Sequence, residues 1–360
     1  MKLLIITQKV DINDDLLGFM HGWIMELVKR CDKITVVALG VGEYHLPSNV
    51  KVLSLGKDKL EIENWKLKII KKFIYLINFY RYIWRERKNY DTVFVHMNKE
   101  YVVLGGIFWR LSGKKIALWY NHNEGNFWSR LAGLLAQRIF YTSKFSFFAR
   151  TGFSKGQLMP AGIDAEVFRQ RESIQSSPFS LLFLGRISPV KNLDILIEAA
   201  STLDKKNTDF VLNIVGEPGG NDLKYFSDIK ELSKDLEAKG KIKFLGKISN
   251  QNAPDYYNSN EIFVNLTNSG SFDKTTLEAM ACEQLVLVSN RAYEDIFSGE
   301  QKKLLMFQEK NADDLARKVE SLFRLDSEEK KKITAQMREI VISRHSLKVL
   351  ADKLFKALSE

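Results

Sequence analysis

The sequence contains little cysteine and no long apolar segment, and both absences narrow the classes of protein it can encode. Its 360 residues include two cysteines, Cys31 and Cys282, which form no CxxC pair. Each lies beside an apolar run, which favours buried free thiols in a reducing compartment over a disulfide framework. No run is long and apolar enough to span a bilayer. The first residues, MKLLIITQKV, are soon followed by aspartates, so they predict a buried strand and not a signal peptide.

Acidic residues are in deficit. The chain has 54 lysines and arginines against 44 aspartates and glutamates, a formal net charge of +10. This excess favours an anionic partner, either a membrane, a nucleic acid or a phosphorylated substrate. The sequence has no nucleic-acid-binding motif, and its cations cluster with Trp, Ile and Phe at helical spacing, so we expect no nucleic-acid partner. A chain of this length, with 45% hydrophobic and 27% charged residues, is typical of a globular protein with two domains.

The first half alternates short apolar runs with helical patterns. The runs predict strands at residues 2–7, 33–39, 50–55, 92–97, 115–120 and 145–150. The patterns between them predict helices at 17–30, 65–88, 101–111 and 127–140. Because the strands are continuously apolar and separated by helices, we expect a parallel sheet covered on both faces.

The same alternation then begins again. Apolar runs predict strands at residues 179–185, 210–216, 241–246, 261–266 and 285–290, with helices starting near 192, 222, 254, 275 and 311. A segment rich in turn formers and charge, residues 161–178, reads as a linker between domains 1–160 and 179–342. The last helical stretch, within 343–360, can pack back across that linker. We therefore expect an α/β protein of two Rossmann-like, doubly wound domains, with ligands bound in a cleft between them at the strands' carboxyl ends.

Two segments of the second half together predict a phosphate site. The first, LGRISPVKN (184–192), follows a strand and contains Arg186 and Lys191. The second, SGSFDKTTLEAMA (269–281), is a small-residue loop that opens a helix and contains Glu278. Free N–H groups at a helix start and two cations suit a diphosphate, and a nearby carboxylate can accept hydrogen bonds from a sugar diol. The pattern favours a nucleotide diphosphate attached to another group.

These motifs make the chain similar to the retaining glycosyltransferases of family 4, which have the GT-B fold. The matching features are GRISPVKN, VGEPGG, FLGKIS, the block that starts at SGSFDKTTLEAMA, and the GID…F signature of the linker. The resemblance is strongest over residues 160–290, and it implies that Arg186 and Lys191 hold the donor diphosphate and Glu278 the ribose. It places further donor contacts at Gly216, Lys247, Ile248, Ser271, Phe272, Lys274 and Thr275. The alternative is that Arg186 and Lys191 are solvated loop charges and Glu278 is a carboxylate on the helix surface. The loops at Gly216 and Lys247 would then be ordinary turns.

The chain departs from the family pattern at one position. The family usually has a second glutamate, which contacts the transferred sugar, eight residues before the position of Glu278. This sequence has Gly270 there. Asp273 lies nearby and is the candidate substitute, so it joins His122, Arg186 and Lys191 among the expected catalytic residues.

The first half supplies two candidate residues. His122 lies in LWYNHNEG, just after a predicted strand, where the family often has a histidine near the reacting sugar. A loop histidine with a structural hydrogen bond is the alternative. Gly18 lies in the loop that takes the place of the family's Gly-rich first loop, so it is the expected phosphate contact there.

The helical stretch at residues 65–88, WKLKIIKKFIYLINFYRYIWRERK, is both basic and aromatic. Its apolar residues at helical spacing, Trp65, Ile69, Phe73, Leu76, Tyr80 and Ile83, predict one packed face. Apolar residues beyond that face and an excess of cations predict that the remainder lies on an anionic membrane surface. Trp109, Arg110, Lys114 and Lys115 are candidates to extend this surface.

The sequence therefore predicts a retaining, metal-independent hexosyltransferase, peripheral on the cytoplasmic membrane face, with a lipid-linked or membrane-associated acceptor. Retention of the anomeric configuration is implied by the resemblance to family 4. The donor is a nucleotide diphosphate sugar, with UDP favoured over GDP, and no other cofactor is expected. The absence of a D-x-D motif fits a site where protein cations replace a metal. The alternatives are a catalytically weak, membrane-bound partner subunit and a nucleotide-sugar epimerase or phosphorylase of the same fold.

Overall fold

The computed structural model describes the chain except for residues 15, 60–64 and 271 and the side chains of residues 59 and 65–68. The chain folds into two compact units. The first contains residues 1–162 and 347–360, and the second contains residues 163–346. The last helix of the chain, α13 (Leu347–Ser359), is therefore part of the first unit.

The first unit contains, within its described residues, a seven-stranded parallel sheet of order β3-β2-β1-β4-β5-β6-β7. Its strands are β1 (Lys2–Val10), β2 (Lys33–Val41), β3 (Val50–Ser54), β4 (Thr92–His96), β5 (Lys115–Trp119), β6 (Arg138–Tyr141) and β7 (Gly156–Leu158). The helices that cover it are α1 (Phe19–Val28), α2 (Trp65–Arg85), α3 (Lys99–Leu111), α4 (Phe127–Leu135), α5 (Phe147–Arg150) and α13.

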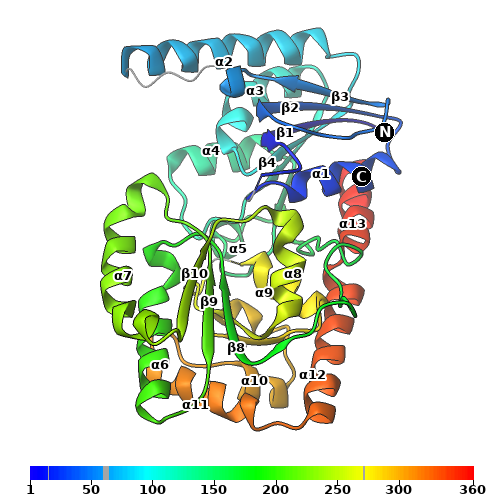
Figure 1. Cartoon of the computed structure of the whole chain (residues 1–360). Coiled ribbons are helices and arrows are strands. Elements are labelled where there is room, and N and C mark those ends of the chain that lie inside the picture. The colour runs from blue at the N-terminus through cyan, green and yellow to red at the C-terminus, as the bar shows by residue number, and fades with distance from the viewer. Residues whose placement is uncertain (15, 60–64, 271) are drawn as a thin grey trace. The chain divides into compact units, whose positions relative to one another are not determined.

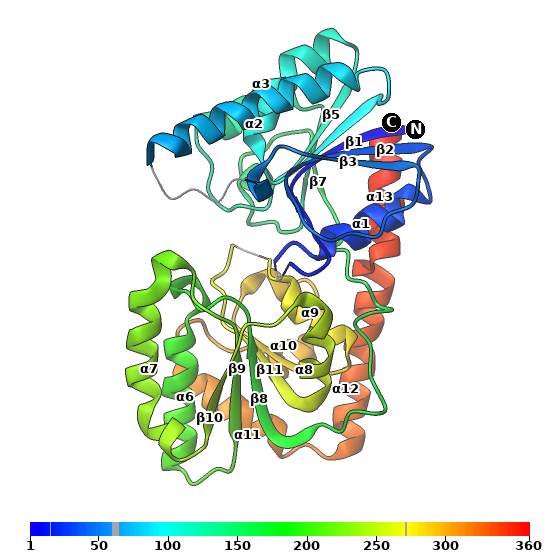
Figure 2. The ribbon, with the colours of Figure 1, turned by 45° about the horizontal axis from the view of Figure 1, so that its top comes forward.

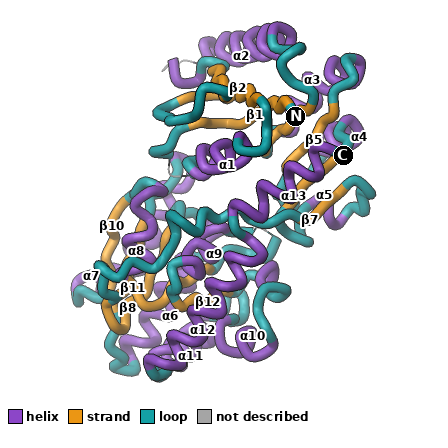
Figure 3. Tube along the Cα trace, turned by 90° about the vertical axis from the view of Figure 1, so that its right-hand side faces the viewer, coloured by secondary structure: helices purple, strands orange, loops and turns teal. Residues whose placement is uncertain are grey.

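Both faces of this sheet are buried, which is why its strands read as continuous apolar runs. In β1, Leu3 and Ile5 pack with α1 and α13, while Leu4 and Ile6 pack on the opposite face with α2 and α3. Successive side chains of a strand point to opposite faces, so both sets must be apolar. Figure 1 shows α2 and α3 on one side of the sheet and α1 on the other. Helices α1 and α13 pack against each other (Figure 3), and Arg30, two residues after α1, forms a 2.7 Å ion pair with Asp352 of α13.

The second unit contains, in its described part, a five-stranded parallel sheet of order β10-β9-β8-β11-β12. The strands are β8 (Ser177–Leu184), β9 (Val211–Val215), β10 (Ile242–Gly246), β11 (Asn260–Asn265) and β12 (Leu285–Val288). The helices are α6 (Leu193–Lys205), α7 (Leu223–Ala238), α8 (Ala253–Ser259), α9 (Lys274–Ala281), α10 (Gly299–Leu305), α11 (Ala312–Phe323) and α12 (Ser327–Ile340). Figure 2 shows α6 and α7 on one side of the sheet and α8 and α9 on the other, as expected where the strand order reverses.

The prediction of a strand at residues 145–150 is wrong. Ser146 accepts a hydrogen bond from the Ala149 N–H and caps the short helix α5, in which Phe147 and Phe148 are buried. The sixth strand is instead β6, which lies partly inside the stretch predicted as a helix at residues 127–140. A short apolar run has no periodicity that distinguishes a strand from a buried helical turn, and here a serine cap decided the outcome.

The packed face predicted for the helix at residues 65–88 is wrong in part. Among the described side chains of α2, Ile83 is buried in the core as predicted, but Phe79 is buried beside it, whereas Ile69, Phe73 and Tyr80 are exposed. The side chain of Trp65, also assigned to that face, lies outside the described residues. The helix has apolar residues around most of its circumference, so helical spacing alone could not select the side that meets the sheet. Trp109 is fully buried and donates to the Tyr90 hydroxyl at 3.1 Å, so it does not extend the surface. Among the described residues, none of the helices combines the length and apolar composition that crossing a bilayer needs.

Candidate functional site

The candidate site lies in the second unit, where the loops after β8, β9 and β10 meet. The Gly185 N–H donates to Val215 O at 3.0 Å, and the Gly216 N–H donates to Gly246 O at 2.8 Å. Gly216 has φ +143°, and a Cβ there would lie 1.9 Å from the Gly185 carbonyl oxygen. Only glycine permits this approach, so the residue holds the Arg186 loop against the loop after β9.

Two cations follow β8, and each has a carboxylate beside it. Arg186 is 52% exposed, and its Nε lies 4.0 Å from Asp222 Oδ2. Lys191 ends the short helical turn at residues 189–191 and is largely buried. Its Nζ donates to Thr267 Oγ1 at 3.1 Å and forms an ion pair with Asp273. The loop therefore brings both predicted cations to the sheet's carboxyl edge.

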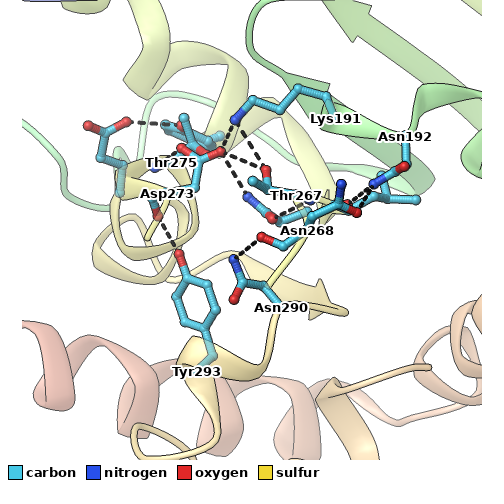
Figure 4. Close-up of polar contacts among 12 residues, drawn as sticks. Lys191, Asn192, Thr267, Asn268, Asp273, Thr275, Asn290 and Tyr293 are labelled. Atoms are coloured by element: carbon cyan, nitrogen blue, oxygen red, sulfur yellow. Dashed lines mark hydrogen bonds and ion pairs between the residues drawn. The ribbon is translucent and has the colours of Figure 1, made fainter. Parts of the chain in front are cut away.

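Asp273 lies at the start of α9, where it is the N-cap residue. Its Oδ2 accepts hydrogen bonds from Lys191, from Thr267 Oγ1 at 3.0 Å and from Asn265 Nδ2 at 3.3 Å. Its Oδ1 accepts from the Thr275 N–H at 3.5 Å. Figure 4 shows Lys191 reaching toward Asp273, with Thr267 beside them. Burial disfavours the charged carboxylate, but Lys191 and these hydrogen bonds outweigh it, so the pKa of Asp273 lies below its usual value.

Glu278 lies inside the protein one turn after Lys274. It is 5% exposed, and its Oε2 accepts a hydrogen bond from the Tyr257 hydroxyl at 3.1 Å. Burial raises the pKa of Glu278 and lowers the pKa of Lys274, and the attraction between the two charges opposes both shifts. The alternative of a solvated carboxylate on the helix surface is therefore excluded.

The residues before α9 are fixed by aromatic packing. The ring of Phe272 stacks on Tyr293 with centroids 5.0 Å apart, and on His345 with centroids 6.1 Å apart. The Tyr293 hydroxyl donates to the Asp273 carbonyl (Figure 4). Ser271, also predicted to contact the donor, lies outside the described residues. This packing and the hydrogen bond from Tyr293 fix the position of the residues at the start of α9.

Two hydroxyl groups of this region have unused hydrogen-bonding capacity. Ser188 lies between Arg186 and Lys191 and is 2% exposed. Its Oγ and the Thr275 Oγ1 are buried and have no hydrogen-bond partner within the described part of the chain. Buried hydroxyls are nearly always paired in proteins, so such atoms in a loop of this kind point to a ligand or ordered water.

Lys247 and Ile248 follow β10 at the same edge of the sheet. Lys247 is exposed, and Ile248 is partly buried. Gly246, which precedes them, accepts the Gly216 N–H, so this loop and the Gly216 loop are directly joined. The predicted base-side residues thus lie in the loops after β9 and β10, which are on the opposite side of β8 from β11.

Comparisons with known proteins concern the second unit first. Residues 164–340 match the family model described as Glycosyl transferases group 1. This segment is a glycosyl transferases group 1 domain. A D-inositol 3-phosphate glycosyltransferase 2 of Catenulispora acidiphila is 31% identical over 133 residues, which cover 34% of this chain and 31% of the relative. A D-inositol 3-phosphate glycosyltransferase of Kribbella flavida is 27% identical over 141 residues, covering 36% and 33%. The matches thus span about a third of the length of these curated relatives.

Solved structures extend the likeness to the whole chain. The Anabaena protein HepE in complex with UDP has a TM-score of 0.77 at 16% identity, and all of both chains is covered. Sucrose-phosphate synthase from Thermosynechococcus elongatus has a TM-score of 0.77 at 14% identity, covering 99% of this chain and 98% of that one. At these identities the likeness concerns the fold, which is GT-B with two Rossmann-like units.

Gly270 of the glycosyl transferases group 1 domain has a backbone that disfavours a glutamate. Its φ is +118°, which side chains other than glycine rarely adopt. A glutamate at this position would therefore be strained on the backbone that this chain adopts. Asp273, the candidate substitute, has its carboxylate directed to Lys191 and Thr267 (Figure 4).

Sequence reasoning did not identify Asn265, Thr267, Tyr257 and Tyr293. Asn265 and Thr267 alternate with apolar residues at the end of β11, in VNLTN, and polar residues at a parallel strand's carboxyl end were the available signal. The two tyrosines gave no signal, because each is fully buried and reaches the site only through its hydroxyl group.

The first unit holds His122 and Gly18. His122 lies in the loop after β5, with its ring 5.1 Å from that of Tyr120. Partial desolvation of the ring, and then the charge of Lys99, lower its pKa. Gly18 is the N-cap of α1. In the loop before it, the Asp14 carboxylate accepts hydrogen bonds from the N–H groups of residues 16 and 17 at 3.0 and 2.8 Å. Those groups are therefore already engaged by a carboxylate of the protein.

A large apolar surface lies on the first unit, and we call it the α2–α3 face. Its exposed apolar side chains are Ile69, Ile70, Phe73, Ile77, Tyr80 and Trp84 of α2 and Leu104, Ile107 and Leu111 of α3. The two helices are side by side, because the Tyr80 hydroxyl donates to Leu104 O at 3.1 Å. Exposed cations of the same stretch are Lys72, Arg81, Arg85 and Lys88.

Proposed function

We propose that this chain is a glycosyltransferase that transfers a sugar from a nucleotide diphosphate sugar to an acceptor. The observation that carries the proposal is the convergence of Arg186, Lys191 and the start of α9 at the carboxyl ends of β8 and β11. Cations and helix N–H groups are what a diphosphate requires. The domain match and the structural likeness to a UDP complex support a nucleotide-sugar donor, and we favour UDP over GDP.

In this proposal the diphosphate is the part of the donor that the site binds, and it is also the leaving group. Negative charge develops on it as the bond to the sugar breaks, and Arg186, Lys191 and the N–H groups of α9 stabilise that charge. Glu278 accepts hydrogen bonds from the ribose diol. Phe272, Lys274 and Thr275 shape the phosphate end of the site, while Gly216, Lys247 and Ile248 shape the base end.

We further propose that the reaction retains the anomeric configuration and needs no metal. A front-face reaction, in which a donor phosphate oxygen accepts the acceptor's proton, needs no protein nucleophile. The cations of Arg186 and Lys191 offset the diphosphate charge that a metal would otherwise balance. His122 and Gly18 are proposed to serve the sugar or the acceptor from the first unit, by hydrogen bonding from the imidazole and the backbone.

The α2–α3 face supports a membrane location for the acceptor. Phe73 is 64% exposed and Trp84 is 59% exposed, and both lie on a helix whose described side chains include the exposed cations Lys72, Arg81 and Arg85, with Lys88 just after its end. Monomeric proteins rarely expose contiguous apolar surface of this kind, and basic amphipathic helices bind anionic bilayers. We therefore propose a peripheral enzyme on the cytoplasmic face of a membrane, with a lipid-linked or membrane-associated acceptor.

The test is turnover of a panel of UDP-, GDP- and ADP-sugars, measured as nucleotide release. We expect slow hydrolysis of one UDP-sugar, and we expect Arg186→Ala and Glu278→Gln to weaken donor binding. Arg324→Ala is the matched control, because Arg324 is an exposed arginine of the same unit at the end of α11. Donor binding that is unchanged by Arg186→Ala would exclude the site, and no turnover of any donor would favour the partner-subunit alternative.

A further inference from the structure

The groups proposed to donate hydrogen bonds to the diphosphate already bind an anion of the protein itself, the Asp273 carboxylate. The Lys191 ammonium, the Asn265 amide and the Thr267 hydroxyl all donate to the Asp273 Oδ2, and the Thr275 N–H donates to Oδ1. The contacts are a permanent cation, neutral donors and a helix N–H. Phosphate oxygens are bound by the same combination of groups.

The Asp273 carboxylate is charged at neutral pH in this position. Lys191 and the hydrogen bonds hold its pKa below the usual value despite burial. Two anions cannot share one buried ammonium and one helix N–H without strong repulsion. A donor phosphate that engages Lys191 must therefore move the carboxylate away or bind beside it at a cost.

We propose that Asp273 is an internal competitor of the donor's distal phosphate, which must displace the carboxylate from Lys191. The inference rests on the proposed function, because it concerns the same site. The buried hydroxyls of Ser188 and Thr275, which find no partner among the described residues, are an independent sign that the site has donors left for a ligand. Asp273 thus sets how tightly the site holds a diphosphate.

The competition is specific for the distal phosphate. Arg186 is the other cation; its side chain is half exposed and its Nε lies 4.0 Å from the Asp222 carboxylate, so that contact is weak. A nucleoside monophosphate lacks the distal phosphate and does not compete with Asp273. Displacement also releases the carboxylate, which makes it available to the transferred sugar near Gly270.

The experiment measures the binding of UDP and UMP to the full-length chain by isothermal titration. Asp273→Asn keeps the size of the side chain and its capping ability and removes its charge. Asp273→Ser is a second neutral variant that also caps a helix. Asp204→Asn is the matched control, because Asp204 is likewise paired with lysines, Lys239 and Lys241, each at 2.7 Å. Lys191→Met, alone and combined with Asp273→Asn, tests the coupling.

We expect both Asp273 variants to bind UDP about tenfold more tightly, as coupled neighbouring charges do, and UMP within about twofold of the wild type. Asp204→Asn should leave both affinities unchanged, and the Asp273→Asn effect should vanish without Lys191. Equal UDP binding by wild type and both variants would overturn the inference while leaving the donor site intact. An equal gain for UMP would also overturn it. Absence of UDP and UMP binding by every variant would instead overturn a uridine-nucleotide donor in the proposed function.

Discussion

The α2–α3 face leads to a quantitative prediction about membrane binding. The perturbation is the replacement of the exposed cations Lys72, Arg81, Arg85 and Lys88 by glutamine. Each cation near an anionic bilayer surface contributes about 1 kcal/mol. The four together contribute about 4 kcal/mol, which corresponds to roughly a thousandfold in partitioning at low salt. At about 0.15 M salt the Debye length is about 8 Å, so the measured effect should shrink.

Co-sedimentation with vesicles measures this partitioning. Wild-type protein should bind vesicles that contain anionic lipid, and the quadruple variant should remain largely in the supernatant. The control replaces Lys224, Lys234, Lys331 and Lys332, exposed lysines of α7 and α12, and makes the same change in net charge. Alanine at Phe73 and Trp84 should weaken binding further, since burying such side chains contributes about 2 kcal/mol each.

Two results would refute this reasoning. Equal binding of the wild type to anionic and neutral vesicles would remove the electrostatic contribution. An equal loss in the control variant would mean that net charge matters and the α2–α3 face does not. Circular dichroism and thermal unfolding of each variant would show that the fold survives, which is expected because all four replaced side chains are exposed.

Three further predictions concern the folded state. Gly216→Ala should lower the free energy of unfolding, measured in urea, by about 3 kcal/mol or more, because the new Cβ would lie 1.9 Å from the Gly185 carbonyl oxygen. Gly220→Ala is the control and should be tolerated, because a Cβ at Gly220 has no atom within 4 Å. Burial lowers the pKa of His345 to about 4 in the folded protein. Below about pH 6.5 the unfolded chain therefore binds a proton that the folded chain does not, and the free energy of unfolding should decline between about pH 6.5 and 4. His345→Gln should flatten that decline, and an unchanged slope would contradict the prediction. Burial raises the pKa of Cys31 to about 11 and raises that of Cys282 further, so neither thiol should react with a disulfide reagent at pH 7 before denaturant is added.

The strands of both sheets were the most predictable part of the fold. Runs such as residues 2–7 and 285–290 are apolar because both faces of a parallel sheet are covered. Local composition is therefore enough to predict that they form strands. The error at residues 145–150 arose where that logic is weakest, in a short phenylalanine-rich run. The hydrogen bond from the Ala149 N–H to Ser146 turns it into a helix.

The site was predictable in its loops and not in its contacts. Arg186, Lys191 and Glu278 follow from residues near strand ends and a helix start. That Lys191 pairs with Asp273 could not be read from the sequence, since the two are far apart along the chain and meet only because β8 and β11 are neighbours.

The sequence alone determined two α/β halves, the strand-end loops with their two cations, and a basic aromatic helix, because these depend on residue type and spacing. Tertiary structure alone decided which side of α2 is buried, that Glu278 lies inside against Tyr257, and that Asp273 holds Lys191. Those outcomes depend on which segments pack together, and packing across the sheet is not encoded in local periodicity.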